Sequence, residues 1–219
     1  MPEYTTRILP LADEAAQRAA FALLAQDEIF AAPTDTVYGI FARPDSALAI
    51  ERIYTAKARP SDKAIPILIG DLDQLGQVAL PPWPRLAEVL MDRFWPGALT
   101  LVFAARPHLP AILTAGQPTI AVRMPAHAAL CALLRQSGPL AATSANRSGG
   151  PDTHSAQEAL AQLDGAIPLI LSDDAPTTRQ SLPSTLVDVT VEDRPRILRP
   201  GELYHEVCAL LAEHGFAIC

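Results

Sequence analysis

Aromatic residues make up only 5% of this chain of 219 residues, and it contains only three cysteines. Because 49% of the residues are hydrophobic, a packed core is expected, built mainly from Ala, Leu, Val and Ile. No two of the cysteines (Cys131, Cys208 and Cys219) are close enough in sequence to form a metal knuckle or a redox pair. An odd number of cysteines without a pairing pattern fits a reducing compartment.

Positive charge is also scarce, since the net charge is −7. This argues against a general polyanion-binding surface, although a local basic pocket is still compatible with it. The start, Met1 to Tyr4, lacks the basic and apolar regions of a secretory signal. No uninterrupted apolar run is long enough to span a bilayer. We therefore expect a cytoplasmic protein without membrane partners.

Several catalytic motifs are missing. The sequence has neither the Gly-x-x-x-x-Gly-Lys-Ser/Thr phosphate loop nor the dinucleotide fingerprint. It also lacks the His-Glu-x-x-His zinc spacing and the Gly-x-Ser-x-Gly nucleophile elbow. The histidines are scattered and suggest neither a triad nor metal ligands. Surface or capping roles are the default expectation for the histidines.

Helical and strand patterns alternate along the chain. Helices are expected at 12–27, after Asp45 or Ser46, at 86–94 and 127–135, after Ser155, and at 203–212. Strands are expected at 28–32, 65–69, 99–103, 119–123, 140–143, 168–171, 185–189 and 196–198. This order predicts an α/β fold with one central sheet and helices on its faces. Several connections look too short for crossover helices, so the sheet should be mixed. We expect a single domain over residues 1–219.

Polar residues cluster just past the ends of apolar strands, where open α/β sheets place their ligands. The first cluster is Pro33–Gly39, which contains Thr34 and Tyr38. Such a loop can bind a small polar ligand by directed hydrogen bonds. Taken alone, a polar turn relaxed by Gly39 is the more common explanation.

The second cluster has three cations within seven residues: Lys57, Arg59 and Lys63. Pro60 favours an extended conformation at Arg59, and extended residues two apart share one face. An arginine and a lysine on one face suit phosphate groups. A solvated run of surface charge is the alternative, and taken alone it is favoured about two to one.

In the third cluster, the small apolar strand at 140–143 leads into Ser144 and Asn146, followed by paired glycines. Hydroxyl, amide and free backbone N–H groups can together hold an anion or a nucleotide. A Ser/Asn/Gly surface loop is the alternative.

Three further candidates lie at strand ends. Ser184 opens the strand at 185–189, while Arg123 and Arg199 each end a strand. An arginine there is a candidate for binding a carboxylate or a phosphate. The alternative is an ordinary ion pair with a nearby acid.

Together these segments resemble the YrdC family of threonylcarbamoyl-AMP synthases. The similarity covers about residues 12–203, and its motifs occur in family order. They are Pro33–Gly39, Lys57-x-Arg59, Phe94–Thr100, Val122–Pro125, Ser144-x-Asn146, Pro183–Thr185 and Leu198–Gly201.

The resemblance implies a three-layer YrdC-like fold: a twisted mixed sheet flanked by helices, with a deep concave groove. It also implies that ATP, L-threonine and bicarbonate are converted to threonylcarbamoyl-AMP and pyrophosphate, with magnesium carried on ATP. The product would pass to the proteins that transfer threonylcarbamoyl to tRNA, with weak or no direct tRNA binding.

The resemblance also implies roles for individual residues. ATP would be held by Lys57, Arg59, Lys63, Ser144, Asn146, Ser184 and Arg199, of which Lys57 and Arg59 would be catalytic. Threonine would be held by Thr34, Tyr38 and Arg123, with Arg123 on its carboxylate.

The chain departs from the family pattern at two places. A histidine that many relatives have after the strand ending at Ile69–Gly70 is missing. Ser181–Leu182 replaces a glycine that often precedes Pro-Ser-Thr, so the segment from Asp173 to Gln180 is expected to loop differently.

Two other functions are alternatives. An RNA-binding module of the same fold is disfavoured by the acidic charge and the few aromatics. A domain that transfers a carbamoyl group from carbamoyl phosphate is the other alternative, although such domains sit within much larger chains.

Overall fold

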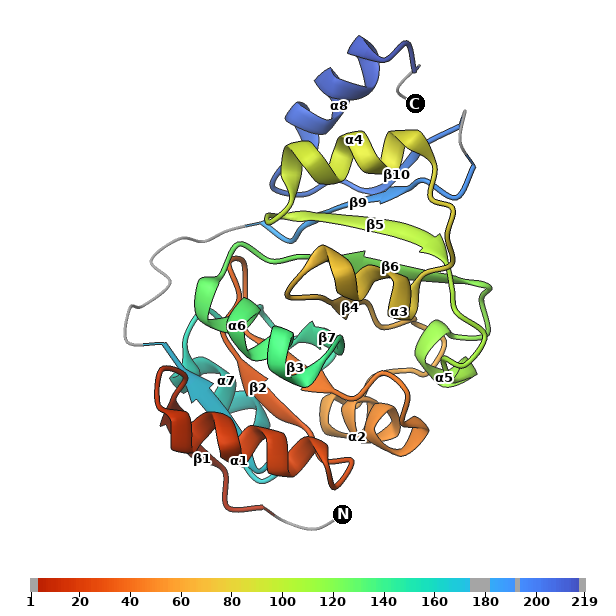
Figure 1. The fold of residues 1–219 in the computed structure, drawn as a ribbon. Helices are drawn as coiled ribbons and strands as arrows, with labels where there is room; N and C mark the ends of the chain where they lie inside the picture. Colours follow the sequence, from red (N-terminus) through yellow and green to blue (C-terminus); the bar gives the residue numbers. More distant parts are fainter. Residues whose placement is uncertain (1–3, 174–181, 192–193, 217–219) are drawn as a thin grey trace.

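The computed structural model describes residues 4–173, 182–191 and 194–216, in which ten strands form one sheet flanked by helices (Figure 1). The strand order is β1-β8-β2-β3-β7-β4-β6-β5-β9-β10. Parallel pairs are β1/β8, β2/β8, β4/β6 and β5/β9, and the other neighbouring pairs are antiparallel. The mixed sheet and the α/β class expected from the sequence are confirmed, while the depth of a groove stays a prediction.

The strands are β1 (Arg7–Pro10), β2 (Phe30–Ala32), β3 (Gly39–Ala42), β4 (Ile67–Leu68), β5 (Leu99–Ala104), β6 (Thr119–Arg123), β7 (Leu140–Ser144), β8 (Leu169–Ser172), β9 (Thr185–Asp188) and β10 (Arg196–Arg199). The α-helices are α1 (Glu14–Leu24), α2 (Ala47–Lys57), α3 (Leu75–Val78), α4 (Arg85–Phe94), α5 (Ala111–Thr114), α6 (Ala128–Ser137), α7 (Ala156–Leu163) and α8 (Tyr204–Glu213); a 3₁₀ turn, η1, covers Leu72–Gln74. None of the helices in the described part combines the length and apolarity needed to cross a bilayer.

The sequence missed two strands, β1 and β3. β1 lies at the edge of the sheet and its outer residues are exposed, while all four residues of β3 are buried, so neither gives an alternating pattern. β3 begins at Gly39, the last residue of the loop that we expected, and returns antiparallel to β2. The loop at 33–39 therefore joins two buried strands, which fixes both of its ends.

Side-chain caps explain where three helices begin. Asp13 accepts a hydrogen bond from the Ala15 N–H at 2.8 Å at the start of α1. The Ser46 hydroxyl accepts from the Ala49 N–H at 3.2 Å, which selects Ser46 over Asp45 as the cap of α2. Ser155 accepts from the Glu158 N–H at 3.1 Å, so the predicted cap of α7 is confirmed.

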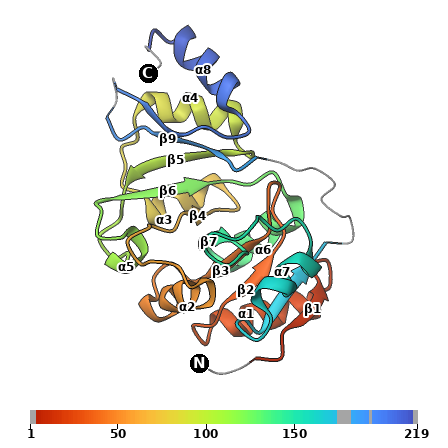
Figure 2. The same cartoon turned by 180° about the vertical axis from the view of Figure 1, so that it is seen from behind.

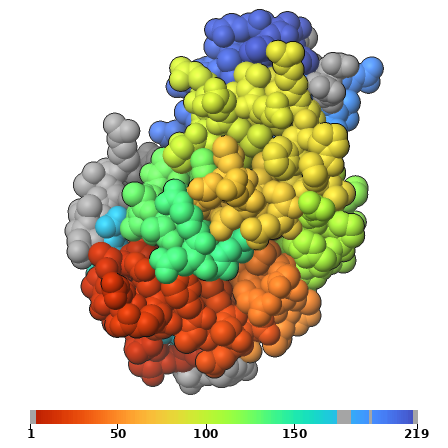
Figure 3. Space-filling view, in the orientation of Figure 1, coloured from red at the N-terminus to blue at the C-terminus, as the bar shows by residue number. Residues whose placement is uncertain are grey.

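Helices cover both faces of the sheet around β2, β3, β7 and β8. Alternate residues of a strand point to opposite faces. Phe30 and Phe41 therefore pack with α1 and α6, and their rings stack at 5.5 Å. Ile40 points to the other face, which packs against α2 and α7. Figure 3 shows α1 (red), α6 (green) and the α3–α4 region (yellow) lying next to one another on one surface of the molecule.

Around β5, β6 and β9 the two faces of the sheet differ. Leu101, Phe103 and Val122 point toward the core that includes α3, α4 and α8. Their strand neighbours point the other way and line a cavity, as Val102 and Ala121 do. Seen from behind, β5 and β6 lie in front of α3 and α4 (Figure 2). This less covered sheet face carries the candidate site.

Candidate functional site

The candidate site is a cavity of about 460 Å³ on the less covered face of the sheet, which we call the sheet cavity. Its walls come from the loop before β3, the segment after α2, and strands β4 to β7, β9 and β10. Among its lining residues are seven that the sequence singled out: Thr34, Tyr38, Arg59, Arg123, Ser144, Ser184 and Arg199. Segments far apart in the chain therefore meet as the strand-end argument predicted.

Three predicted residues do not line the sheet cavity. Lys63 is exposed outside it, and Lys57 and Asn146 are buried behind its wall. The Lys57 side chain is only 1% exposed, and its ammonium donates hydrogen bonds to the Ser144 carbonyl and, at 2.6 Å, to the Asn146 carbonyl. A third bond, at 3.1 Å, goes to the Asn146 side-chain oxygen. Lys57 thus fixes the backbone that presents Ser144 to the cavity.

The expected extended arrangement of Lys57 and Arg59 is wrong. Lys57 is the last residue of α2, and Ala58 after it has a φ of +49°, in the left-handed region. Because of this turn, the Lys57 side chain lies behind the cavity wall, whereas Arg59 lines the cavity. The two charges are still near each other. Burial, and after it the charge of Arg59, lower the pKa of Lys57 to about 8, while the charge of Asp152 opposes this shift.

Arg59 is half-buried, and burial lowers the pKa of its guanidinium. Its Nη2 donates to the Ala64 carbonyl at 3.3 Å. Among the described residues, its buried Nε has no hydrogen-bond partner. Because leaving a buried donor unpaired is costly, Arg59 has binding capacity to offer a ligand.

Thr34 organises the loop before β3. Its hydroxyl accepts from the N–H groups of Thr36 and Val37, at 3.0 and 3.2 Å, and donates to the Val37 carbonyl at 2.7 Å. Tyr38 is buried, which raises the pKa of its phenol, and its hydroxyl accepts from the Asp173 N–H at 3.3 Å. The loop is thus held open as a rigid turn whose polar groups line the cavity.

Arg123 already holds several partners. Its Nε donates to the Gly97 carbonyl at 2.9 Å and Nη1 donates to the Thr36 hydroxyl at 3.1 Å. Nη2 forms a buried ion pair with Asp35. Arg123 is therefore paired with a nearby acid, which was the alternative to a ligand-binding role. A guanidinium has five N–H donors, so Arg123 can still donate to a ligand.

Ser184, directly before β9, and Arg199, at the end of β10, form a second polar group of the cavity. The Ser184 hydroxyl lies 2.7 Å from that of Thr100 and accepts from Arg199 Nη2 at 3.1 Å. Burial, and after it the charge of Arg123, lower the pKa of Arg199. An anion between Arg123 and Arg199 would relieve this repulsion.

Two glycines explain the local course of the chain. A Cβ at Gly201 would lie 2.2 Å from the Pro183 carbonyl oxygen, so only glycine lets the chain after β10 pass the Ser184 strand end. A Cβ at Gly70 would lie 2.5 Å from the Cys131 carbonyl oxygen. No side chain fits at Gly70 itself, where the chain runs against α6.

Several polar residues of the site were not candidates from the sequence; besides the four discussed next, Gln117, Thr119 and Thr143 line the cavity. Thr36, Thr100 and Asp152 line the cavity, and Asp35 pairs with Arg123 behind it. Asp35 and Thr36 lie in the loop already singled out, so their types were a usable signal. Thr100 could be found from the alternation of residues along β5, because it lies on the same face as Val102. Asp152 lies between a strand and a helix, where no sequence pattern marks it. Of the segment from Asp173 to Gln180 that is expected to loop differently, residues 174–180 lie outside the described residues.

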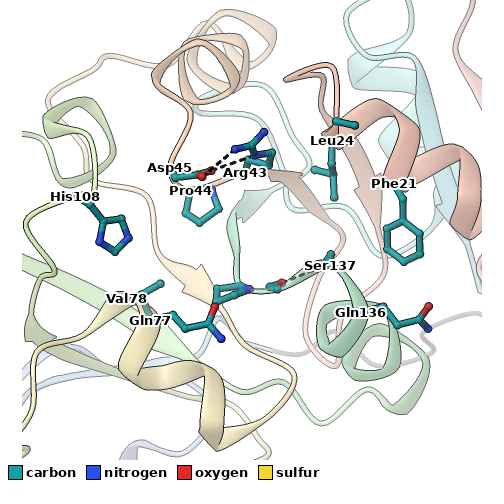
Figure 4. A pocket seen from close by; sticks show the side chains of 13 residues that line it. Phe21, Leu24, Arg43, Pro44, Asp45, Gln77, Val78, His108, Gln136 and Ser137 are labelled. Carbon is teal, nitrogen blue, oxygen red and sulfur yellow. Dashed lines mark hydrogen bonds and ion pairs between the residues drawn. The ribbon is translucent and has the colours of Figure 1, made fainter.

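A second cavity of about 460 Å³ lies among α1, α3, α6 and the start of α2 (Figure 4). None of the residues singled out from the sequence lines it. Its charged groups satisfy each other, because Arg43 donates to Asp45 through Nε at 3.1 Å and Nη2 at 2.8 Å. The sheet cavity is therefore the better candidate.

Known proteins are similar over most of this length. A family model named Sua5/YciO/YrdC, described as telomere recombination, matches residues 22–201. A threonylcarbamoyl-AMP synthase of Bacillus subtilis is 43% identical over 189 residues, covering 85% of this chain and 54% of the relative. One from Vibrio vulnificus is 35% identical over 181 residues, covering 81% and 94%.

Among solved structures, Pyrococcus abyssi Sua5 complexed with L-threonine has a TM-score of 0.87 and 36% identity. The match covers 98% of this chain and 62% of that one. The chain spans about half the length of the B. subtilis relative and nearly all of the V. vulnificus one.

Proposed function

The chain belongs to the Sua5/YciO/YrdC family, and we propose that it is an L-threonylcarbamoyladenylate synthase. The proposed reaction converts ATP, L-threonine and bicarbonate to threonylcarbamoyl-AMP and pyrophosphate, which is a nucleotidyl transfer. The observation that carries the proposal is the meeting of Arg59, Arg123 and Arg199 at one cavity of an otherwise acidic chain.

Threonine is assigned to the end of the cavity formed by Thr34, Tyr38 and Arg123. Support comes from the relative that was crystallised with L-threonine and from the unused donors of Arg123. Asp35, the ion-pair partner of Arg123, keeps the guanidinium oriented. The threonine carboxylate would then bind N–H donors that are already in position. Burial raises the pKa of Tyr38, which favours its neutral phenol, so its hydroxyl can donate a hydrogen bond to threonine.

The triphosphate is assigned to Arg59, Ser144, Ser184 and Arg199. The buried Nε of Arg59 has no hydrogen-bond partner in the part of the chain that the structure describes, so it is a donor that Arg59 can offer an anion. Lys57 and Asn146 are assigned a supporting role, since the bonds from the Lys57 ammonium set the position of Ser144. Lys63 is exposed, and we assign it to the entrance for the anionic substrate.

The chemistry needs charge neutralisation more than a nucleophile. Threonine's amine forms an N–C bond with CO₂ and releases a proton, or with bicarbonate and releases water, to give a carbamate. A carbamate oxygen then attacks the α-phosphorus while the bond to pyrophosphate breaks and pyrophosphate leaves. Two anions must approach each other, so arginines on both sides lower the barrier by neutralising charge. Holding both substrates in one cavity supplies the positioning.

Magnesium is proposed to enter as part of the nucleotide substrate. The polar groups that line the cavity are mainly hydroxyls and guanidiniums, and Asp152 is the only Asp or Glu among its described lining residues. This donor set suits an ion held mostly by phosphate oxygens and water.

We place the reaction in the cytoplasm, with the product handed to the proteins that transfer threonylcarbamoyl to tRNA. Direct tRNA binding is expected to be weak, because the net charge is −7.

Mass spectrometry with ¹³C-bicarbonate tests the proposal. The purified chain, ATP, magnesium and L-threonine should give threonylcarbamoyl-AMP that is heavier by one labelled carbon, together with pyrophosphate. The Arg59→Met variant serves as the matched negative control. Absence of the labelled adenylate with the folded wild-type chain would reject the proposed activity.

A further inference from the structure

Asp152 brings a carboxyl group to a cavity otherwise lined by cations, hydroxyls, the Gln117 amide and apolar groups. It is the only aspartate or glutamate among the described lining residues. Three arginines share the cavity with it: Arg59, Arg123 and Arg199. A carboxylate beside a proposed triphosphate site would repel the ligand unless a cation lies between them.

The position of Asp152 is fixed by the residues on both sides. The Pro151 carbonyl accepts a hydrogen bond from Gln162 Nε2 at 2.9 Å. On the other side, the buried Thr153 donates through its hydroxyl to the Ala145 carbonyl at 3.2 Å, and its own carbonyl accepts from the Tyr38 N–H at 2.8 Å. The backbone of Asp152 is thus tied to both proposed ligand regions, because Tyr38 belongs to one and Ala145 follows Ser144 of the other.

The carboxylate itself is available. Within residues 4–173, 182–191 and 194–216 it forms no hydrogen bond or ion pair, and the residue is exposed to the cavity. Its charge acts on Lys57 and Arg199, which places it near the proposed phosphate-binding residues. Neither cation reaches it as a salt bridge, since Lys57 is committed to carbonyl oxygens and Arg199 to Ser184.

We propose that Asp152 binds the divalent cation that enters on the triphosphate, directly or through one of its water molecules; this inference rests on the proposed function. Magnesium in nucleotide sites usually takes one or two carboxylates, phosphate oxygens and several waters. One fixed carboxylate among arginines matches that requirement. The ion would also screen Asp152 from the phosphates and add positive charge where the carbamate meets the α-phosphorus.

The test measures ATP binding with and without the metal by isothermal titration calorimetry, in the absence of threonine. The variants are Asp152→Asn, Asp152→Ala and the control Asp164→Asn, which removes a carboxylate from the exposed end of α7, outside the cavity. In magnesium, both Asp152 variants should bind ATP at least about tenfold more weakly than wild type. In EDTA they should bind it as well as wild type or better, because a like charge has been removed. Asp164→Asn should match wild type in both conditions.

A second readout follows the metal. Water-proton relaxation with Mn²⁺ and ATP should show the enhancement of the ternary complex with wild type and Asp164→Asn, and a reduced enhancement with Asp152→Asn.

Three results would overturn the inference. If Asp152→Asn weakens ATP equally in magnesium and EDTA, the carboxylate contacts the nucleotide itself, for example its ribose hydroxyls. If Asp152→Asn binds magnesium–ATP like wild type, the carboxylate has no role in holding the ion. If the wild-type chain binds no ATP in either condition, the proposed function fails and this inference fails with it.

Discussion

Two halves of one sheet are used in different ways. Around β2, β3, β7 and β8, helices cover both faces, and successive strand residues such as Phe41 and Ile40 belong to two separate cores. Around β5, β6 and β9, only every second residue enters a core, and residues such as Val102 line the sheet cavity. The difference shows how the fold makes a binding site without breaking its sheet: helices leave part of one face open.

Lys57 connects α2 to the wall of the sheet cavity. It ends α2, which packs on the fully covered half, and its ammonium holds the Ser144 and Asn146 backbone at the cavity wall. A buried residue at the end of a helix thereby holds part of the cavity wall in place.

The largest expected difference compares two leucine truncations. Leu169→Ala in β8 removes a fully buried side chain and should lower the free energy of unfolding by about 2–5 kcal/mol. Leu186→Ala in β9 trims a half-buried side chain at the cavity, so its cost should be about 1 kcal/mol. Urea denaturation of both variants measures the contrast. Equal costs would show that the two sheet halves do not differ in packing as described.

Lys57→Met and Arg59→Met separate support from direct binding. Lys57→Met leaves two carbonyls and an amide oxygen without their donor, and should cost about 2–3 kcal/mol of stability. Arg59→Met should change stability by no more than about 0.5 kcal/mol. Both should lose pyrophosphate release with threonine and bicarbonate present. Wild-type release rates in both variants would remove these residues from the reaction.

The pH dependence of the Lys57 contribution is the next largest effect. The folded-state pKa of about 8 lies below the ordinary 10.5, so the unfolded chain binds the proton more tightly between these values. The stability of wild type relative to Lys57→Met should therefore rise with pH above 8, by on the order of 1–2 kcal/mol between pH 7.5 and 9.5. Urea titrations of both proteins across that range measure it, and a constant difference would contradict the low pKa.

Arg123→Ala tests the threonine end of the cavity. Losing the proposed carboxylate contact should raise the threonine KM by about tenfold, which is about 1.4 kcal/mol, with a smaller change in the ATP KM. Steady-state pyrophosphate assays with each substrate varied give both values. A matching increase for ATP and threonine would assign Arg123 to general support of the cavity.

The smallest expected effect is at the hydrogen bond between Thr100 and Ser184. Thr100→Val keeps the shape of the side chain and removes one hydroxyl partner of Ser184, which keeps Arg199. Stability should fall by about 1 kcal/mol, and ATP affinity by a few-fold or less. Calorimetry and urea denaturation check both values, and a complete loss of ATP binding would show that Thr100 itself contacts the ligand.

Much of this arrangement follows from the sequence, for identifiable reasons. Strand ends carry their side chains to shared edges and faces, so Arg123, Ser144, Ser184 and Arg199 were predicted together and lie together. Lys57 was misjudged because one left-handed residue, Ala58, separates it from Arg59, and no residue type there signals a positive φ. The ion pair of Arg123 with Asp35 is a contact between distant segments, which local patterns do not encode.

The walls of the sheet cavity come from segments between Thr34 and Arg199, which span most of the chain. A partly folded molecule or an internal fragment therefore contains no smaller version of the site. Ligand binding is consequently linked to folding of the strands that line the cavity, and a ligand that binds only the folded chain should stabilise it increasingly as its concentration rises above its Kd. Screening by thermal shift can thus detect ligands of the cavity without an assay of the reaction.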